Sequence, residues 1–386
     1  MKLLKSLTLT VGISALSLFT YYACKSTPTI DKAISQGASQ SASMATESTD
    51  RPQRLPLKDA YRSFFPIGAA VDDGVFLDDD SYSKFLATQY SSLTPANQLK
   101  PKRIHAEEKT FSWSKMDKLV LFARNHQMKV RGHYLIAGSD MPAWFYHDGN
   151  KLASKELLLQ RIEDHIKTVV KKYEKDVYCW DVVNEAVAQN YKRHPFKYND
   201  TLYQILGEEY IAKAFEFARK AAPNAKLFYN DNKFEDPGKR KHIYDLISKL
   251  KKRGVPIDGI GIQCHTSIEG LSEVEFTKTI KEFAGLGLEV QITELDVSMY
   301  PVGIKANSVK RMANANTAEN LKKQADIYEM VFRVCRENKA LITGLTMWAP
   351  ADWDNSLTTK IKVKNYPYLF DRSLKPKAVV NKITEF

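Results

Sequence analysis

The chain has 386 residues, of which 44% are hydrophobic and 26% are charged. These proportions are those of a folded globular protein and exclude a chain that is disordered over most of its length. Lys and Arg exceed Asp and Glu by 57 − 45 = 12, and the densest basic clusters, GKRKH and KKRGVPIDG, lie beside helical patterns without interleaved aromatic residues. They predict solvated helix faces rather than a nucleic-acid groove, with attraction to an acidic surface or polymer as the alternative interpretation.

The first segment of the chain has the pattern of an export signal. Lys2 and Lys5 precede an apolar run that ends at Cys24 and is at the short limit for a membrane-spanning helix. Residues 1–24 are similar to a bacterial lipoprotein signal, in which Cys24 becomes lipidated; an ordinary cleaved signal peptide is the alternative. Residues 25–54, rich in Ser and Thr, predict a flexible tether. We therefore expect an exported protein that is lipid-anchored at a bacterial membrane or cell surface, or otherwise periplasmic or secreted.

Residues 55–386 alternate short β-rich runs with longer amphipathic segments. The eight β-rich runs are FFPIGAAV, YSSLTP, MKVRGHYLI, DVYCWDVVNE, AKLFYND, IDGIGIQCH, LEVQITELDV and ITGLTMWAP. Segments such as KELLLQRIEDHIKTVVKKYEK and NLKKQADIYEMVFRVCRENK, with apolar residues three or four apart, predict helices between them. This alternation predicts parallel strands and a single (β/α)8 TIM barrel. An open doubly wound sheet is the alternative, but no glycine-rich phosphate turn follows any of the runs.

Polar side chains collect at the ends of these runs, where a (β/α)8 barrel carries the groups that act on its substrate. In chain order they are Asn97, Lys100, His133, Asn184, Glu185, Asn230, Asp231, Gln263, His265, Glu294, Asp296 and Trp348. We expect these side chains to converge on one mouth of the barrel. No HExxH or comparable ligand spacing occurs, so neither a metal site nor another cofactor is expected.

Glu185 and Glu294 end the fourth and seventh runs and would lie across that mouth from one another. Two carboxyl groups in one cleft are suited to glycoside hydrolysis, in which one protonates the leaving oxygen and the other attacks the sugar or activates water. For either glutamate alone, an ion pair or a hydrogen bond to a loop is the alternative. Asn184 and Glu185 are adjacent, so both reach the site only if the chain bends at the end of the strand.

From about Leu55 onward the chain resembles glycoside hydrolase family 10, the β-1,4-xylanases. The motifs that carry the resemblance are RGHYLI, WDVVNEAV, LFYNDN, GIGIQCH, QITELDV, TMWAPAD and YLFDRSLKPKA, in the family's order. The resemblance implies that Glu185 is the proton donor and Glu294 the nucleophile of a retaining double displacement, which requires carboxyl groups about 5 to 5.5 Å apart. It implies a supporting set of Asn184, His265 and Asp296, and a substrate-binding set of Asn97, Lys100, His133, Gln263 and Trp348.

Several positions depart from the family's pattern. Ala96 replaces a Glu, Ala137 to Asp140 replace Trp-His-x-Gln, Ser356 replaces a second Trp near Trp353, and Asn232 replaces a stacking Tyr. Asp140 and Asn232 are still predicted to contact the substrate. Each missing contact costs about 1 to 3 kcal/mol of substrate binding, so we expect linear xylan to be a poor substrate and the space at Ala137 and Gly138 to admit a branched chain.

The sequence thus favours a retaining endo-β-1,4-xylanase-type hydrolase that cleaves xylan or a decorated xylan. One alternative is a β-glycosidase of the same fold that acts on another β-glycan or a glycoside conjugate. The other is a non-catalytic glycan-binding protein of the cell surface, against which the presence of both Glu185 and Glu294 argues. The expected partner is a polysaccharide; no nucleic acid is expected, and a membrane only through the N-terminal lipid.

Overall fold

The computed structural model describes residues 54–72, 77–194, 196–197, 200–304, 308, 315–352 and 363–386. The predicted signal with Cys24, nearly all of the predicted tether, and the positions Trp353 and Ser356 lie outside the described residues. Within those ranges, no helix is both long enough and apolar enough to cross a bilayer.

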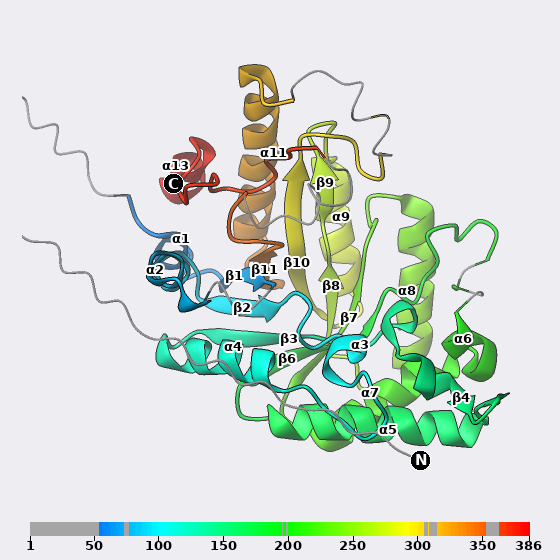
Figure 1. Ribbon diagram of the computed structural model, residues 1–386. Helices are drawn as coiled ribbons and strands as arrows, with labels where there is room; N and C mark the ends of the chain where they lie inside the picture. Colours follow the sequence, from blue (N-terminus) through cyan, green and yellow to red (C-terminus); the bar gives the residue numbers. More distant parts are fainter. Residues whose placement is uncertain are drawn as a thin grey trace, which may run out of the picture. The chain divides into compact units, whose positions relative to one another are not determined.

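Eight parallel strands form a closed barrel, which confirms the (β/α)8 prediction (Figure 1). Each strand pairs with its neighbours in chain order, and the last strand pairs with the first, so the sheet has no free edge in this ring. The strands are β1 (Ile67–Val71), β2 (Ser92–Pro95), β3 (Lys129–Ile136), β6 (Val177–Asn184), β7 (Lys226–Asp231), β8 (Gly259–Ile262), β10 (Glu289–Ser298) and β11 (Ile342–Met347). Seven of them fall within the runs that the sequence predicts, and β10 extends one residue beyond its run, to Ser298.

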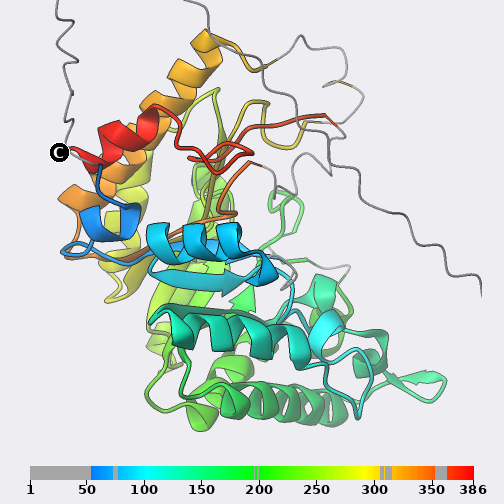
Figure 2. The same ribbon diagram turned by 60° about the vertical axis from the view of Figure 1, so that its left-hand side comes forward.

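Helices cover the outside of the barrel, and Figure 2 shows the early ones lying one after another outside the first strands. The main helices are α2 (Asp80–Gln89), α4 (Ser114–Asn125), α5 (Lys155–Lys172), α7 (Glu209–Ala221), α8 (Pro237–Lys252), α9 (Glu273–Ala284), α11 (Ala318–Glu337) and α13 (Val379–Thr384). Helix α2 has no strong apolar stripe, because Tyr82 and Leu86 are its only buried apolar residues. Its start is fixed instead by Asp79, whose side chain accepts a hydrogen bond from the backbone N–H of Tyr82.

Shorter elements join these units. They are α1 (Leu57–Ala60), α3 (Pro101–Ile104), η2 (Gly138–Asp140), η3 (Ala143–Tyr146), β4 (His147–Asp148), β5 (Lys151–Leu152), α6 (Thr201–Leu206) and β9 (His265–Ser267). Strand β9 extends the barrel wall at the mouth, because it pairs in parallel with the end of β10, with His265 opposite Asp296.

The interior of the barrel contains a charged cluster among apolar side chains. Arg131 on β3 and Asp181 on β6 form a bidentate ion pair, and Arg131 Nε also donates to Gln291 Oε1 on β10 at 3.0 Å. Both charged side chains are at most 1% exposed. Burial would raise the pKa of Asp181, but the charge of Arg131 lowers it, so the pair is ionised. This cluster forms the floor beneath the polar residues of the mouth.

Candidate active site

Glu185 follows Asn184, the last residue of β6, and the chain bends at this point, as it must for both side chains to reach the site. Its φ of +55° is in the left-handed region, which is uncommon for residues other than glycine. The bend is held by its backbone N–H, which donates to the carbonyl of Asn230 at 2.8 Å. As a result both Asn184 and Glu185 contact the same group: Gln263 Nε2 lies 3.4 Å from Asn184 Oδ1 and 3.0 Å from Glu185 Oε1.

Glu294 lies on β10 with 4% of its surface exposed, and both of its carboxylate oxygens have fixed partners. Oε1 accepts a hydrogen bond from Asn230 Nδ2 at 2.8 Å, and Oε2 lies 3.1 Å from His265 Nε2. The other ring nitrogen of His265, Nδ1, lies 2.7 Å from Asp296 Oδ2. The carboxylate of Glu294 is therefore held in one orientation by two neighbours.

One hydrogen-bond network joins the two glutamates. Asn230 Nδ2 donates both to Asn184 Oδ1 and to Glu294 Oε1, at 2.8 Å each. Gln263 donates to Glu185 through its side chain, while its carbonyl accepts the backbone N–H of Glu294 at 3.0 Å. The structure thus brings the carboxylates of β6 and β10 to the same end of the barrel, as the sequence predicts.

The charge of His265 is set by its two carboxylate neighbours. Burial opposes protonation of the ring. The charges of Asp296 and Glu294 and their hydrogen bonds to the ring outweigh burial and raise the pKa of His265 to about 10. At neutral pH both ring nitrogens therefore carry protons, and the ring donates to Asp296 on one side and to Glu294 on the other.

The charge of Glu185 is set by a lysine that is absent from the predicted site residues. Burial would raise the pKa of Glu185, but the charge of Lys197, a hydrogen bond from Gln263 and the charge of Lys239 together lower it to about 2. Lys197 Nζ lies 3.4 Å from Glu185 Oε2. Lys239 is fully buried and is already paired with Asp231 at 2.7 Å. Without a bound substrate, Glu185 is therefore a carboxylate.

Two of the predicted sugar ligands lie around this pair. His133 Nδ1 contacts Asp181 Oδ2 at 2.8 Å, so the interior ion pair sets the orientation of its ring. The indole of Trp348 is edge-on to the rings of His133 and His265, with centroid distances of 5.3 and 6.0 Å. Trp348 therefore adjoins the His265–Glu294 pair at the mouth, where its face is of the size and polarity to pack on a pyranose.

The remaining predicted ligands make contacts within the protein. Asn97 Nδ2 donates to Asp72 Oδ1 at 2.6 Å, and Asn232 Oδ1 accepts from Lys239 at 2.6 Å and Gln189 at 2.7 Å. Asp140 accepts a hydrogen bond from the hydroxyl of Tyr134.

Tyr134, which is not among the predicted site residues, is close enough to both glutamates for their charges to affect its hydroxyl. Its ring lies below Lys100, whose Nζ is 6.0 Å from the ring centroid. Burial raises the pKa of Tyr134, and the carboxylates of Asp140, Glu185 and Glu294 raise it further, so the hydroxyl stays neutral. Tyr134 lies inside the RGHYLI motif but not at the end of its strand, and Lys197 lies in no motif, so neither is among the strand-end residues from which the site is predicted.

This arrangement suits acid–base and nucleophilic chemistry at one centre. Two carboxylates share one network, one beside a lysine and the other fixed by an imidazolium and an amide. Among the residues that the structure describes, no group of three or more His, Cys, Asp or Glu side chains is placed to hold a metal ion. A (β/α)8 barrel with two carboxylates at the carboxyl ends of its strands is the architecture of a glycoside hydrolase.

Comparison with known proteins identifies the family. The model of glycosyl hydrolase family 10 matches residues 56–386, and the chain belongs to this family. The chain is 40% identical to the beta-1,4-xylanase of Dictyoglomus thermophilum, over 86% of this chain and 90% of that protein. It is also 40% identical to endo-1,4-beta-xylanase A of Caldicellulosiruptor saccharolyticus, over 86% of this chain and 96% of the relative. The crystal structure of xylanase XynB from Paenibacillus barcinonensis superposes with a TM-score of 0.80 at 36% identity, covering 87% of this chain and 99% of that one.

Proposed function

We propose that the protein is a retaining endo-β-1,4-xylanase that cleaves xylan or a decorated xylan by double displacement. The observation that carries the proposal is the network of Asn230 and Gln263, which ties Glu185 and Glu294 to one end of the barrel. The family and the xylanase relatives support the same reaction class. They favour it over the alternative of a non-catalytic glycan-binding protein.

In the proposed first step, Glu294 attacks the anomeric carbon while Glu185 gives a proton to the leaving oxygen. The sugar–oxygen bond breaks as a glycosyl ester forms on Glu294. His265 and Asn230 hold the Glu294 carboxylate in its attacking orientation and exclude other rotamers. Asn184 lies beside Glu185 and is the proposed partner of the sugar 2-hydroxyl.

In the second step, Glu185 takes a proton from a water molecule that attacks the same carbon from the opposite side to Glu294. The ester breaks and the product keeps its original anomeric configuration. For this step the ionised state of Glu185 is the active one, which fits the low pKa of about 2 in the free enzyme. For the first step Glu185 must gain a proton, so its surroundings must change when the glycan binds.

The test is the anomeric configuration of the first product released from a xylo-oligosaccharide, followed by NMR during hydrolysis. We expect the β-anomer first, with later mutarotation. Release of the α-anomer would show an inverting reaction and contradict the assignment of Glu294 as nucleophile. Absence of hydrolysis on every xylan would contradict the proposed activity itself.

We also propose that the mature protein is exported and lipid-anchored through Cys24. The support is the sequence of residues 1–24, where a basic start and an apolar run end at this cysteine. Expression in a bacterial host with a radiolabelled fatty acid tests the proposal. We expect label in the wild-type protein and none in Cys24→Ala; equal labelling of both would contradict it.

A further inference from the structure

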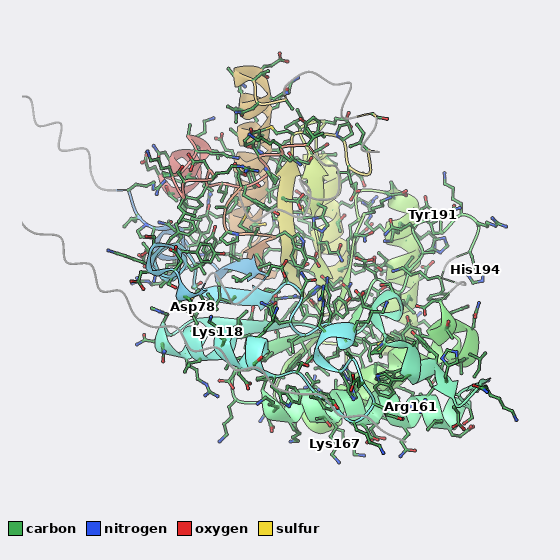
Figure 3. All side chains as sticks on the ribbon, viewed as in Figure 1. Asp78, Lys118, Arg161, Lys167, Tyr191 and His194 are labelled. Atoms are coloured by element: carbon green, nitrogen blue, oxygen red, sulfur yellow. The ribbon has the colours of Figure 1, made fainter. Side chains whose placement is uncertain are left out.

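A cavity of about 560 Å³ lies beside Glu185, between the segment after β3 and the segment after β6. This volume is within the range of pockets that hold small ligands. Gly138 and Ser139 form one wall, and Gln189, Arg193, Lys197 and Asp200 form the other. Figure 3 labels Tyr191 and His194 on the segment that contributes the second wall, near helix α6.

The cavity adjoins the site through two of its lining side chains. Lys197 lines the cavity and also contacts Glu185, with Nζ 3.4 Å from Oε2. Gln189 lines it and donates to Asn232 Oδ1 at 2.7 Å. A group bound in the cavity and a sugar ring bound at Glu185 could therefore belong to one molecule.

The polar wall of the cavity is basic. Within the described ranges, the exposed side chain of Arg193 has no hydrogen-bond or ion-pair partner. Lys197 pairs with Glu185, and its charge also acts on the carboxylate of Asp200. Asp200 is the acidic residue of the wall, but burial raises its pKa and its Oδ1 already accepts the backbone N–H of Leu202 at 3.0 Å. The rest of the lining includes Tyr146, Ala188 and Phe196, which offer apolar surface for the face of a ring.

The cavity depends on a glycine at position 138. A Cβ atom at Gly138 would lie 1.3 Å from Asp200 Oδ2 and 2.0 Å from its Cγ, which no pair of atoms tolerates. A side chain at this position would therefore displace the carboxylate of Asp200, which lines the cavity. Gly138 is also one of the positions at which the sequence analysis identifies a departure from the family's pattern.

We propose that this cavity binds a branch sugar that carries a carboxylate, a uronic acid linked to the xylan backbone, and that Lys197 moves from Glu185 toward the carboxylate of the branch. The inference rests on the proposed xylanase function and adds the class of decoration that the enzyme recognises. Arg193 and Lys197 supply charge-assisted hydrogen bonds to the carboxylate, and the apolar part of the lining packs against the ring.

The movement of Lys197 would supply the change that the first chemical step needs. The groups near Glu185 are Lys197, Gln263 and, at longer range, Lys239, Asp231 and Tyr134. Lys239 is buried and held by Asp231 and Asn232, and Gln263 is neutral, so Lys197 is the neighbour that a ligand can draw away. Once Lys197 has moved, Glu185 can hold a proton and act as the acid.

The experiment compares two matched polymers. One is a xylan that carries uronic-acid branches; the other is the same xylan after chemical reduction of its carboxyl groups to alcohols. We expect kcat/KM to be about tenfold higher on the acidic polymer, the size of one charge-assisted hydrogen bond. Equal values, with both polymers cleaved, would overturn the inference and leave the proposed function standing. Cleavage of neither polymer would overturn both.

Two variants separate binding at the cavity from a general effect of charge. Arg193→Ala should lose most of the preference for the acidic polymer. The matched control is Arg253→Ala, at the end of α8 and so at the face of the barrel opposite the mouth, where the arginine pairs with Glu209. It should keep the full preference. An equal loss in both variants would overturn the inference.

The pH profile of kcat distinguishes a positioning role of Lys197 from a purely structural one. The descending limb of the pH profile of kcat reports deprotonation of the acid in the bound enzyme. In the wild type this limb should lie at higher pH on the acidic polymer than on the reduced one. In Lys197→Gln the descending limb on the reduced polymer should move to higher pH, because loss of the lysine charge raises the pKa of Glu185. Identical limbs in the wild type would overturn the coupling.

Discussion

The two halves of the active-site mouth are built differently. On the β10 side, both oxygens of Glu294 have partners, and the imidazolium of His265 is itself fixed by Asp296. On the β6 side, Glu185 is more exposed and its carboxylate contacts Gln263 and a lysine from a loop. A nucleophile gains from a fixed position, whereas a group that must both give and take a proton needs surroundings that can change.

The largest expected effect on activity comes from a change on the β10 side of the mouth, at Glu294. Glu294→Ala should lower kcat on xylan by at least about 10³-fold, because it removes the carboxylate on which the proposed glycosyl ester forms. Glu294→Gln keeps the size of the side chain and should be as inactive. A thermal unfolding curve close to that of the wild type would show that the fold is intact. More than a few per cent of residual activity in both variants would break the assignment.

Removal of the Asn230 side-chain amide, which joins the β6 and β10 sides of the mouth, should have the next largest effect on activity. Asn230→Ala deletes the donor to Glu294 Oε1 and to Asn184 Oδ1, and we expect a loss of about 10²-fold in kcat, typical for one preorganised donor. Asn381→Ala, on the exposed surface of α13, is the matched control and should be neutral. A change confined to KM in Asn230→Ala would show that the amide serves binding rather than orientation.

The charge of His265 predicts a pH dependence of stability. Its folded pKa of about 10 is above the unfolded value of about 6.5, so the stabilisation is complete below pH 6.5 and is lost as the pH rises through 10. We expect the urea midpoint of the wild type to fall between pH 7 and 10 by more than that of His265→Gln. Parallel curves for the two proteins would mean that the ring is neutral in the folded state.

Gly138→Ala should destabilise the protein by about 0.5 to 2 kcal/mol, because the new methyl group displaces Asp200 from the backbone N–H at the start of α6. The same substitution in an Asp200→Ala background should cost less, since the clash has been removed. Urea unfolding of the wild type, the two single variants and the double variant gives the coupling energy between positions 138 and 200. An additive result would contradict the contact between the two residues.

The smallest expected effect is that of a surface ion pair. Arg253 and Glu209 are each more than one third exposed, so Arg253→Ala should change the free energy of unfolding by less than about 1 kcal/mol. A larger loss, measured in the same urea experiment, would mean that the pair contributes more than exposed pairs usually do.

The sequence predicts the eight strands, because each is a short apolar run with polar residues at its end. It also locates the residues that the network joins, since Asn184, Glu185, Gln263, His265, Glu294 and Asp296 lie in motifs next to strand ends. Helix α2 is not predicted by the same patterns, since only two of its buried residues, Tyr82 and Leu86, are apolar.

Lys197 and Tyr134 are not predicted for a different reason. Lys197 comes from a loop whose path depends on the segments around it, and its contact with Glu185 spans twelve positions with no pattern between them. Tyr134 has the pattern of an ordinary strand residue, and only the fold brings its hydroxyl to Asp140 and toward both glutamates. Local patterns therefore locate the parts of a site that strands carry, but not the parts that loops supply.

The ion pair inside the barrel limits how the specificity of this enzyme can be altered. Arg131, Asp181 and Gln291 come from three strands, and loss of one charged partner would leave the other buried without solvent, at a cost of about 3 to 5 kcal/mol. His133 Nδ1 contacts Asp181 Oδ2, so the position of the His133 ring depends on this cluster. Libraries aimed at new polysaccharides should therefore hold these four positions constant and diversify the loops after β3 and β6.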